Sequence, residues 1–181
     1  MIIALVRHGE TNFNKAHILQ GQLDTSLNDT GIQQAWICGE LLKSTNINWS
    51  TIYSNSLKRA AQTAQIFSQI LNKKIKFDDN LKERDYGEAT GLSYEKYKKL
   101  LNDKKDIGIE KNHNFELRVI SAFHKIIEFE RPNNFILVSH GGCISRIISN
   151  VVSMKIYIEN ASPIFLEYTQ DTFRIANITI K

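Results

Sequence analysis

The chain of 181 residues contains little cysteine and little proline, and it has no long hydrophobic run. Its two cysteines, Cys38 and Cys143, are too few for a disulfide framework and lack metal-ligand spacing, so we expect reduced thiols in a cytoplasmic protein. The two prolines, Pro132 and Pro163, mark no linker, and no internal repeat divides the sequence. We therefore predict a single domain over residues 1–181, a length that is ample for one core.

The apolar and charged segments exclude two further classes of protein. The longest apolar run near the start, Ile2 to Val6, is too short for a membrane span and unlike a signal peptide, so no membrane association is expected. The net charge of +4 would suit an anionic partner. However, the lysines are spread over segments such as 73–76 and 96–99, which is typical of solvated helix faces. We predict no nucleic-acid partner, because no basic stripe with interleaved aromatic residues is present.

What the sequence does contain is a short apolar segment ending in polar residues at three places. Residues 2–6, 51–53 and 135–138 each form such a segment, and the first and third end in histidine followed by glycine. The carboxyl ends of parallel strands are where ligands bind in α/β proteins, because loops and helix N-termini converge there. The side chains that follow these segments include Arg7, His8, Arg59 and His140.

Hydrophobic periodicity predicts alternating strands and helices. The predicted helices cover 32–42, 57–71, 93–102 and 117–127, with another opening at Ile144. The predicted strands cover 2–6, 51–53, 75–77 and 135–138, followed by two closing strands at 164–168 and 173–178. A turn is expected at 28–31 and an ordered loop at 82–91, whereas 103–114 is the least structured segment. This order predicts an α/β fold with a mostly parallel sheet and helices on both faces.

The same side chains suit phosphoryl transfer, which needs a nucleophile, cations around the phosphoryl oxygens, and an acid for the leaving oxygen. His8 is our candidate nucleophile, with one ring nitrogen held by a nearby acceptor. Arg7 and Arg59 offer planar donor forks for phosphate, and His140 a further donor, so no metal or other cofactor is required. The competing interpretations are a satisfied strand-end histidine at His8 and a surface salt bridge at Arg59.

Four segments together resemble the histidine phosphatase superfamily, the phosphoglycerate mutase-like group. They read RHGET at residue 7, SNSLKRAAQTA at residue 54, LKERDYGEATG at residue 81 and SHGG at residue 139. The resemblance extends from Met1 to about Arg146, and four motifs in the family's order are far more specific than any one alone. It implies a three-layer α/β/α fold and a phosphohistidine at His8.

The resemblance also implies the proton donor and the substrate-binding residues. Glu83 stands where the family carries its general acid, and the alternatives nearby are Glu10, Asp85 and Glu88. Asn14, Gln20 and Gly21 match residues that line the phosphate pocket in relatives. Thr11, Ser54 and Gly141 are weaker candidates for the same pocket, whereas we expect His17, His113 and His124 to be surface or packing residues.

The sequence departs from its relatives in two places that shape the pocket. Many relatives carry Gly, Glu and Ser where this chain has residues 109–111, and of these three only the glutamate, Glu110, is present here. In the loop 87–91, Ala89 and Thr90 replace the aromatic and acidic residues of relatives. The cofactor-dependent mutases carry an insert and a tail that this chain lacks. Because a mutase must shield its phosphoenzyme from water, the compact length favours hydrolysis.

We therefore expect a phosphomonoester hydrolase acting on a small phosphorylated substrate. The alternatives are a phosphoglycerate mutase and a non-catalytic phosphate-binding module. The sequence does not identify the natural substrate. It is compatible with a homo-oligomer but does not indicate one.

Overall fold

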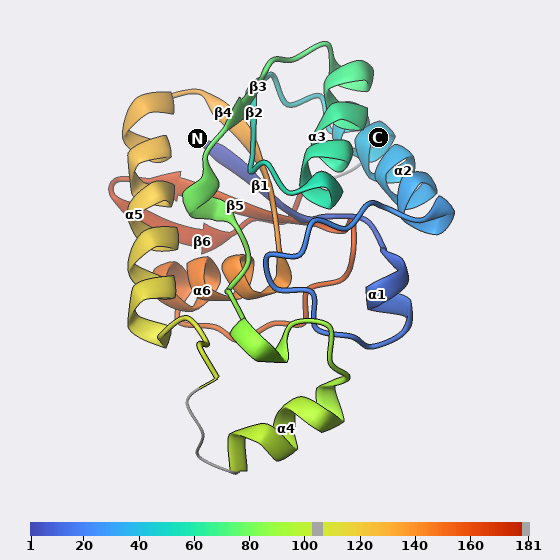
Figure 1. The fold of residues 1–181 in the computed structure, drawn as a ribbon. Helices are drawn as coiled ribbons and strands as arrows, with labels where there is room; N and C mark the ends of the chain where they lie inside the picture. The colour runs from blue at the N-terminus through green and yellow to red at the C-terminus, as the bar shows by residue number, and fades with distance from the viewer. Residues whose placement is uncertain (103–106, 179–181) are drawn as a thin grey trace.

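The computed structural model describes residues 1–102 and 107–178, and a six-stranded sheet lies at the centre of that part of the chain (Figure 1). The strand order is β3-β2-β4-β1-β5-β6. The four strands from β3 to β1 are parallel, β5 is antiparallel to β1, and β6 is antiparallel to β5. Their bounds are Ile2–Arg7 (β1), Trp49–Ser54 (β2), Ile75–Phe77 (β3), Asn134–Ser139 (β4), Pro163–Thr169 (β5) and Thr172–Ile175 (β6). The mostly parallel α/β sheet is therefore confirmed.

Helices cover both faces of this sheet, which gives the three predicted layers (Figure 1). On one face lie α2 (Asp29–Ser44) and α3 (Lys58–Leu71), and on the other lie α5 (Asn112–Glu130) and α6 (Gly141–Val152). The remaining short elements are α1 (Asn12–Lys15), the 3-10 turns η1 (Asp79–Leu81) and η2 (Gly87–Ala89), and α4 (Tyr94–Asn102). Figure 1 shows α4 at one end of the molecule, away from the sheet.

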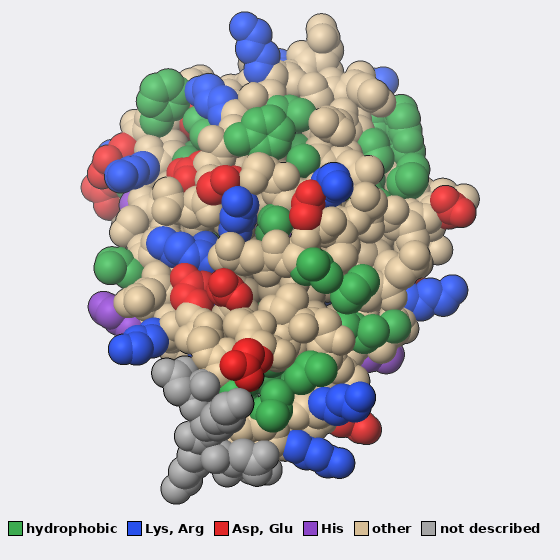
Figure 2. All heavy atoms as spheres, viewed as in Figure 1, with side chains coloured by type: hydrophobic (Ala, Val, Ile, Leu, Met, Phe, Trp, Pro, Cys, Tyr) green, Lys and Arg blue, Asp and Glu red, His purple; other side chains and the backbone are tan. Residues whose placement is uncertain are grey.

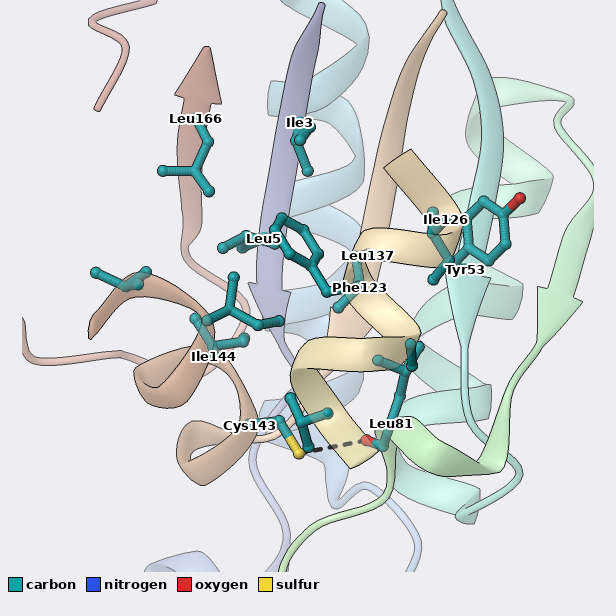
Figure 3. Packing of buried hydrophobic residues seen from close by; sticks show 14 of the residues in the cluster. Ile3, Leu5, Tyr53, Leu81, Phe123, Ile126, Leu137, Cys143, Ile144 and Leu166 are labelled. Carbon is teal, nitrogen blue, oxygen red and sulfur yellow. Dashed lines mark hydrogen bonds between the residues drawn. The ribbon is translucent and has the colours of Figure 1, made fainter. Parts of the chain in front are cut away.

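The apolar run of β1 is continuous because both of its faces are buried. Leu5 packs with Phe123 of α5 and Ile144 of α6 on one side of the sheet (Figure 3). Val6 packs on the other side against the α2 and α3 layer, where Phe67 is fully buried. Successive side chains of a strand point to opposite faces, so a strand between two helical layers has no polar face.

Several predicted boundaries are corrected by the structure. The expected turn at 28–31 is the start of α2, because the side chain of Asn28 accepts a hydrogen bond from Gly31 N and caps the helix. The helix expected from Leu117 begins at Asn112, so the last part of the segment 103–114 is ordered; residues 103–106 lie outside the described residues. The last strand ends at Ile175 instead of residue 178.

No helix in residues 1–102 and 107–178 is long and apolar enough to cross a membrane. Positive and negative side chains are interspersed over the face of the molecule that Figure 2 shows. The basic side chains on that face are scattered and form no stripe there.

The N-terminus of α2 presses against the backbone that follows β1. A Cβ atom at Gly31 would meet the backbone of Glu10, and a Cβ atom at Gly9 would meet the backbone of Gly31. These two glycines allow the chain after β1 to lie directly on α2. The position of the loop that follows the first strand is therefore set by backbone contact.

We predict that Gly31→Ala destabilises the protein, because backbone atoms cannot rotate away from the new methyl group. The expected loss in the free energy of unfolding is about 1–3 kcal/mol, measured by urea denaturation. Gly39→Ala in the same helix is the matched control. There the new methyl group meets the flexible end of Ile70, and the gain in helix propensity of about 0.5–1 kcal/mol offsets much of the crowding. Equal effects of the two substitutions would contradict this account.

Candidate active site

Three strands end side by side and bring their following residues together. In the parallel pair β1 and β4, Arg7 is opposite Ser139, and His8 N donates to Ser139 O at 2.9 Å. The two strands thus present His8 and His140 at the same level. Asn55, which follows β2, places its Nδ2 atom 3.1 Å from Nε2 of His140. The predicted convergence of the strand ends is present in the structure.

The geometry of His8 leaves one ring nitrogen available. Its side chain is 3% exposed, and its Nδ1 atom lies 2.7 Å from the carbonyl oxygen of Gly9. A carbonyl oxygen only accepts, so Nδ1 carries the proton in this contact and Nε2 of the neutral ring keeps its lone pair. The ring of His140 lies edge-on, with its centroid 5.1 Å from that of His8.

Both histidines are held in the neutral form. Burial, together with the positive charge of Arg59, lowers the pKa of His8 well below its usual 6.5. The same two causes lower the pKa of His140. A neutral imidazole is a nucleophile, whereas an imidazolium is not, so this environment keeps the free nitrogen of His8 reactive.

Arg59 is a buried cation bound to neutral acceptors. The side chain is 1% exposed, and it donates to the carbonyl oxygens of Leu23 and Gly21, both at 2.7 Å. Burial lowers the pKa of Arg59 to about 10, which leaves the guanidinium charged at neutral pH. The alternative of a surface salt bridge at Arg59 is wrong, because the side chain is buried and donates to uncharged oxygens of Leu23, Thr25 and Gly21.

Three buried polar side-chain atoms among the described residues have no hydrogen-bond partner. They are Nε of Arg7, Nε of Arg59 and Nδ1 of His140. Buried polar groups are normally satisfied, so each unpaired atom calls for an explanation. All three belong to residues near His8, and a bound anion there would offer the oxygen acceptors that Arg7 and Arg59 lack.

A cavity of about 230 Å³ lies in front of these residues. Eight of the predicted site residues line it, whereas Thr11, Ser54 and His140 are fully buried and do not line it. The lining residues are Arg7, His8, Asn14, Ile18, Leu19, Gln20, Gly21, Arg59, Glu83, Tyr86, Gly141 and Gly142.

Thr11 and Asn14 form the N-terminal cap of α1. Asn14 N donates to the Thr11 hydroxyl at 3.1 Å, and Thr11 N donates to Oδ1 of Asn14 at 3.1 Å. Thr11 also lies within hydrogen-bond distance of Oε1 of Gln20. Asn14 is therefore both a helix cap and a wall of the cavity, while Thr11 supports the two side chains that reach it.

Glu83 enters the cavity from the loop between η1 and η2. Its carboxylate accepts from Gly142 N at 3.0 Å and from Arg84 N at 2.9 Å. Gly142 lies in the first turn of α6, where backbone N–H groups are free to bind an acceptor. A Cβ atom at Gly142 would collide with this carboxylate, so glycine is needed there for the close approach.

The alternative acids are placed elsewhere. Glu10 accepts from Asn28 Nδ2 at 2.8 Å and does not line this cavity. Asp85 is exposed and accepts from Gly87 N at 2.8 Å, and Glu88 is exposed on η2. Of the four carboxyl groups considered, Glu83 is the one that lines the cavity with His8.

An ion pair that the sequence left unexplained holds the Glu83 loop. Glu110 accepts two hydrogen bonds from Arg118 of α5, at 2.7 and 2.9 Å. Arg118 donates further to the carbonyl oxygens of Glu83 at 2.9 Å, Lys82 at 2.6 Å and Asn80 at 2.8 Å. The planar guanidinium of Arg118 thus binds the backbone before and after the Glu83 side chain, and this fixes the Glu83 loop to α5.

Some residues of the site were not predicted. Asn55 could have been found, since it follows a strand end like His8 and His140. No pattern in the sequence pointed to Arg118, because only the folding of the chain brings it next to the Glu83 loop. The histidines at 17, 113 and 124 are exposed, as expected. No group of three or more histidine, cysteine or acidic side chains in the described ranges is arranged to hold a metal ion.

The family model for the histidine phosphatase superfamily, branch 1, matches residues 3–181. The chain belongs to the histidine phosphatase superfamily. Membership in this superfamily makes it an enzyme of the phosphatase and phosphoglycerate mutase type. The resemblance found in the four sequence motifs is confirmed.

Relatives within the superfamily carry both kinds of name. The chain is 31% identical to "Uncharacterized phosphatase PhoE" of Bacillus subtilis, over 98% of this chain and 94% of that protein. It is 32% identical to "Probable phosphoglycerate mutase GpmB" of Salmonella paratyphi A, over 87% and 77% of the two chains. The solved structure of Bacillus stearothermophilus YhfR, 22% identical, has the same fold with a TM-score of 0.87 over 97% and 95% of the chains.

We predict that stability falls as the pH is lowered from 7.5 to 5. Unfolded histidine takes up a proton near pH 6.5, whereas His8 and His140 stay neutral in the fold, so the unfolded state binds more protons. Well below pH 6.5, each should contribute about 1.4 kcal/mol per pH unit to the slope. Urea denaturation in phosphate-free buffer measures it. His140→Asn should reduce the slope, whereas His124→Asn on the exposed face of α5 should not; an unchanged slope in His140→Asn would contradict the argument.

Proposed function

We propose that this protein hydrolyses phosphomonoesters through a phosphohistidine on His8, with Glu83 as the proton donor. The observation that carries the proposal is the set of three unpartnered buried donors, on Arg7, Arg59 and His140, around a neutral histidine. A phosphoryl group has the oxygens to accept from all three donors. The uncharged state of His8 and its free Nε2 atom suit it to attack the phosphorus.

In the first step, Nε2 of His8 forms a bond to phosphorus while the bond from phosphorus to the ester oxygen breaks. The Glu83 carboxyl group gives its proton to the departing oxygen, so the product leaves as an alcohol. Arg7 and Arg59 neutralise the charge on the remaining phosphoryl oxygens. The Nδ1 contact with Gly9 O holds the ring in one tautomer throughout.

In the second step, water replaces the alcohol and attacks the phosphohistidine. The Glu83 carboxylate takes a proton from this water as the new bond to phosphorus forms. The bond from phosphorus to His8 then breaks, and the free histidine and inorganic phosphate are restored. The same carboxyl group serves as acid and then as base, which balances the protons over one cycle.

Phosphoglycerate mutase activity is the second candidate, because one relative is named a probable mutase. Hydrolysis is favoured by the space next to the site. A cavity of about 670 Å³ shares Arg7 and Asn14 with the catalytic cavity, so the site adjoins a space that can hold water. A mutase must exclude that water.

We also place the protein in the cytoplasm. Cys38 and Cys143 are both unpaired and buried, which suits a reducing compartment.

Phosphorus NMR of the protein with 3-phosphoglycerate, and separately with a panel of phosphomonoesters, tests the proposal. We expect inorganic phosphate without 2-phosphoglycerate, with chelator present and with or without 2,3-bisphosphoglycerate. His8→Ala should abolish turnover while unfolding cooperatively in urea. Turnover by His8→Ala would overturn the phosphohistidine, and formation of 2-phosphoglycerate stimulated by the bisphosphate would make the protein a mutase.

Glu83→Gln tests the proton donor separately. We expect kcat/KM to fall by about 10²–10⁴ for methyl phosphate, whose alkoxide needs a proton to leave. The fall should be much smaller for p-nitrophenyl phosphate, because that leaving group departs as a stable anion. Asp85→Asn is the matched control, since Asp85 lies two residues away and is exposed. An equal loss with both esters would exclude Glu83 as the acid.

A further inference from the structure

A second, larger cavity adjoins the catalytic one. Its volume is about 670 Å³, against about 230 Å³ for the cavity in front of His8. The two share Arg7, Asn14, Ile18 and Leu19, so they adjoin at the phosphate-binding arginine. A phosphoryl group alone would leave the larger cavity unused, and its volume is in the range of pockets that enclose whole ligands.

One wall of this outer cavity joins the α1 segment to α4. Ile18 forms a bridge with Ser93, and Leu19 N donates to Leu92 O at 2.9 Å. This pairing places Tyr94, the first residue of α4, at the cavity. The wall is therefore built on backbone hydrogen bonds and has a defined position.

A second wall is fixed to β1 and to the residue that follows it. Ala161 N donates to Arg7 O at 2.8 Å, and Asn160 Nδ2 donates to His8 O at 2.7 Å. Nη1 of Arg7 donates to Ile158 O at 2.9 Å. Tyr157, the residue before Ile158, lines the cavity from this side. The wall thus has a fixed relation to the two residues that face the phosphate.

Aromatic side chains stand on both walls and are left open to solvent. Tyr157 is 84% exposed and Tyr94 is 53% exposed, and Phe13 of α1 lines the same cavity. Tyr94 belongs to a row of rings: its centroid is 6.0 Å from that of Tyr97, which is 5.6 Å from that of Tyr86 in the catalytic cavity. Exposed aromatic groups around a concave site are typical of ligand binding.

We propose that this outer cavity binds the leaving group of the substrate, and that it selects small esters whose alcohol carries an aromatic ring. The inference rests on the proposed function, because the ring is placed by a phosphoryl group held at Arg7. A planar ring entering between Tyr94 and Tyr157 contacts aromatic faces or edges on two sides. A saturated ring of the same size lacks the quadrupole that favours such pairs.

The test compares benzyl phosphate with cyclohexylmethyl phosphate, two primary esters of similar size that differ in the aromatic ring. We expect kcat/KM to be about 3- to 10-fold higher for benzyl phosphate, the range given by one or two aromatic contacts. Tyr157→Leu and Tyr94→Leu should each move the ratio toward one. The variants Tyr157→Phe and Tyr94→Phe keep the ring and should keep the ratio.

Phe129→Leu is the matched control, because Phe129 is a 70% exposed aromatic residue of α5 outside both cavities. Its ratio should equal that of the unsubstituted protein. Equal kcat/KM for the two esters, unchanged in Tyr157→Leu, would overturn the aromatic subsite while leaving the hydrolase intact. Absence of phosphate release from either ester, or release by His8→Ala, would instead overturn the proposed function on which the subsite rests.

Discussion

The parallel pairing of β1 with β4 is the constraint on which the site depends. The two strands are 132 residues apart in the chain at every paired position, yet their register places Arg7 opposite Ser139. From that one alignment it follows that His8 and His140 emerge together and lie edge to face. Both strands are buried on both faces, so a shift in register would disrupt two cores at once. The hydrophobic effect thereby fixes the geometry of two polar side chains.

At this end of the sheet, burial and the charges of the two arginines together determine the protonation state of the two histidines. Arg7 and Arg59 are cations in a buried region, and Arg59 is bound to carbonyl groups that do not neutralise it. The attraction of Glu83 compensates these buried charges only in part, because burial still lowers the pKa of both arginines, and the rest of the fold bears the cost of that burial. The same positive field keeps the histidines neutral. An anion that enters the cavity would compensate the remaining positive charge, so the cost of burying the arginines favours the binding of an anion.

How much of this could be predicted from the sequence depends on whether a feature is local. The approach of His8, Arg59 and His140 was predictable, because parallel strands end at one edge of a sheet and the motifs follow three apolar segments. The start of α5 was not, since Asn112 and its neighbours lack apolar periodicity and are ordered by the helix that follows. The role of Arg118 depends on contacts with residues 35 or more positions away. No pattern in a single sequence carries that information.

Because of the hydrogen bonds of Arg118, the Glu83 loop and α4 are held differently, although they lie close together in the chain. Glu83 is fixed through Arg118 to α5, which packs on the sheet, whereas α4 follows only eleven residues later and stands apart from it. The segment that lines the outer cavity can therefore change in sequence or position while the Glu83 carboxyl group stays aligned with the strand ends. In such an architecture, substrate preference can diverge between related enzymes without a new arrangement of the chemistry.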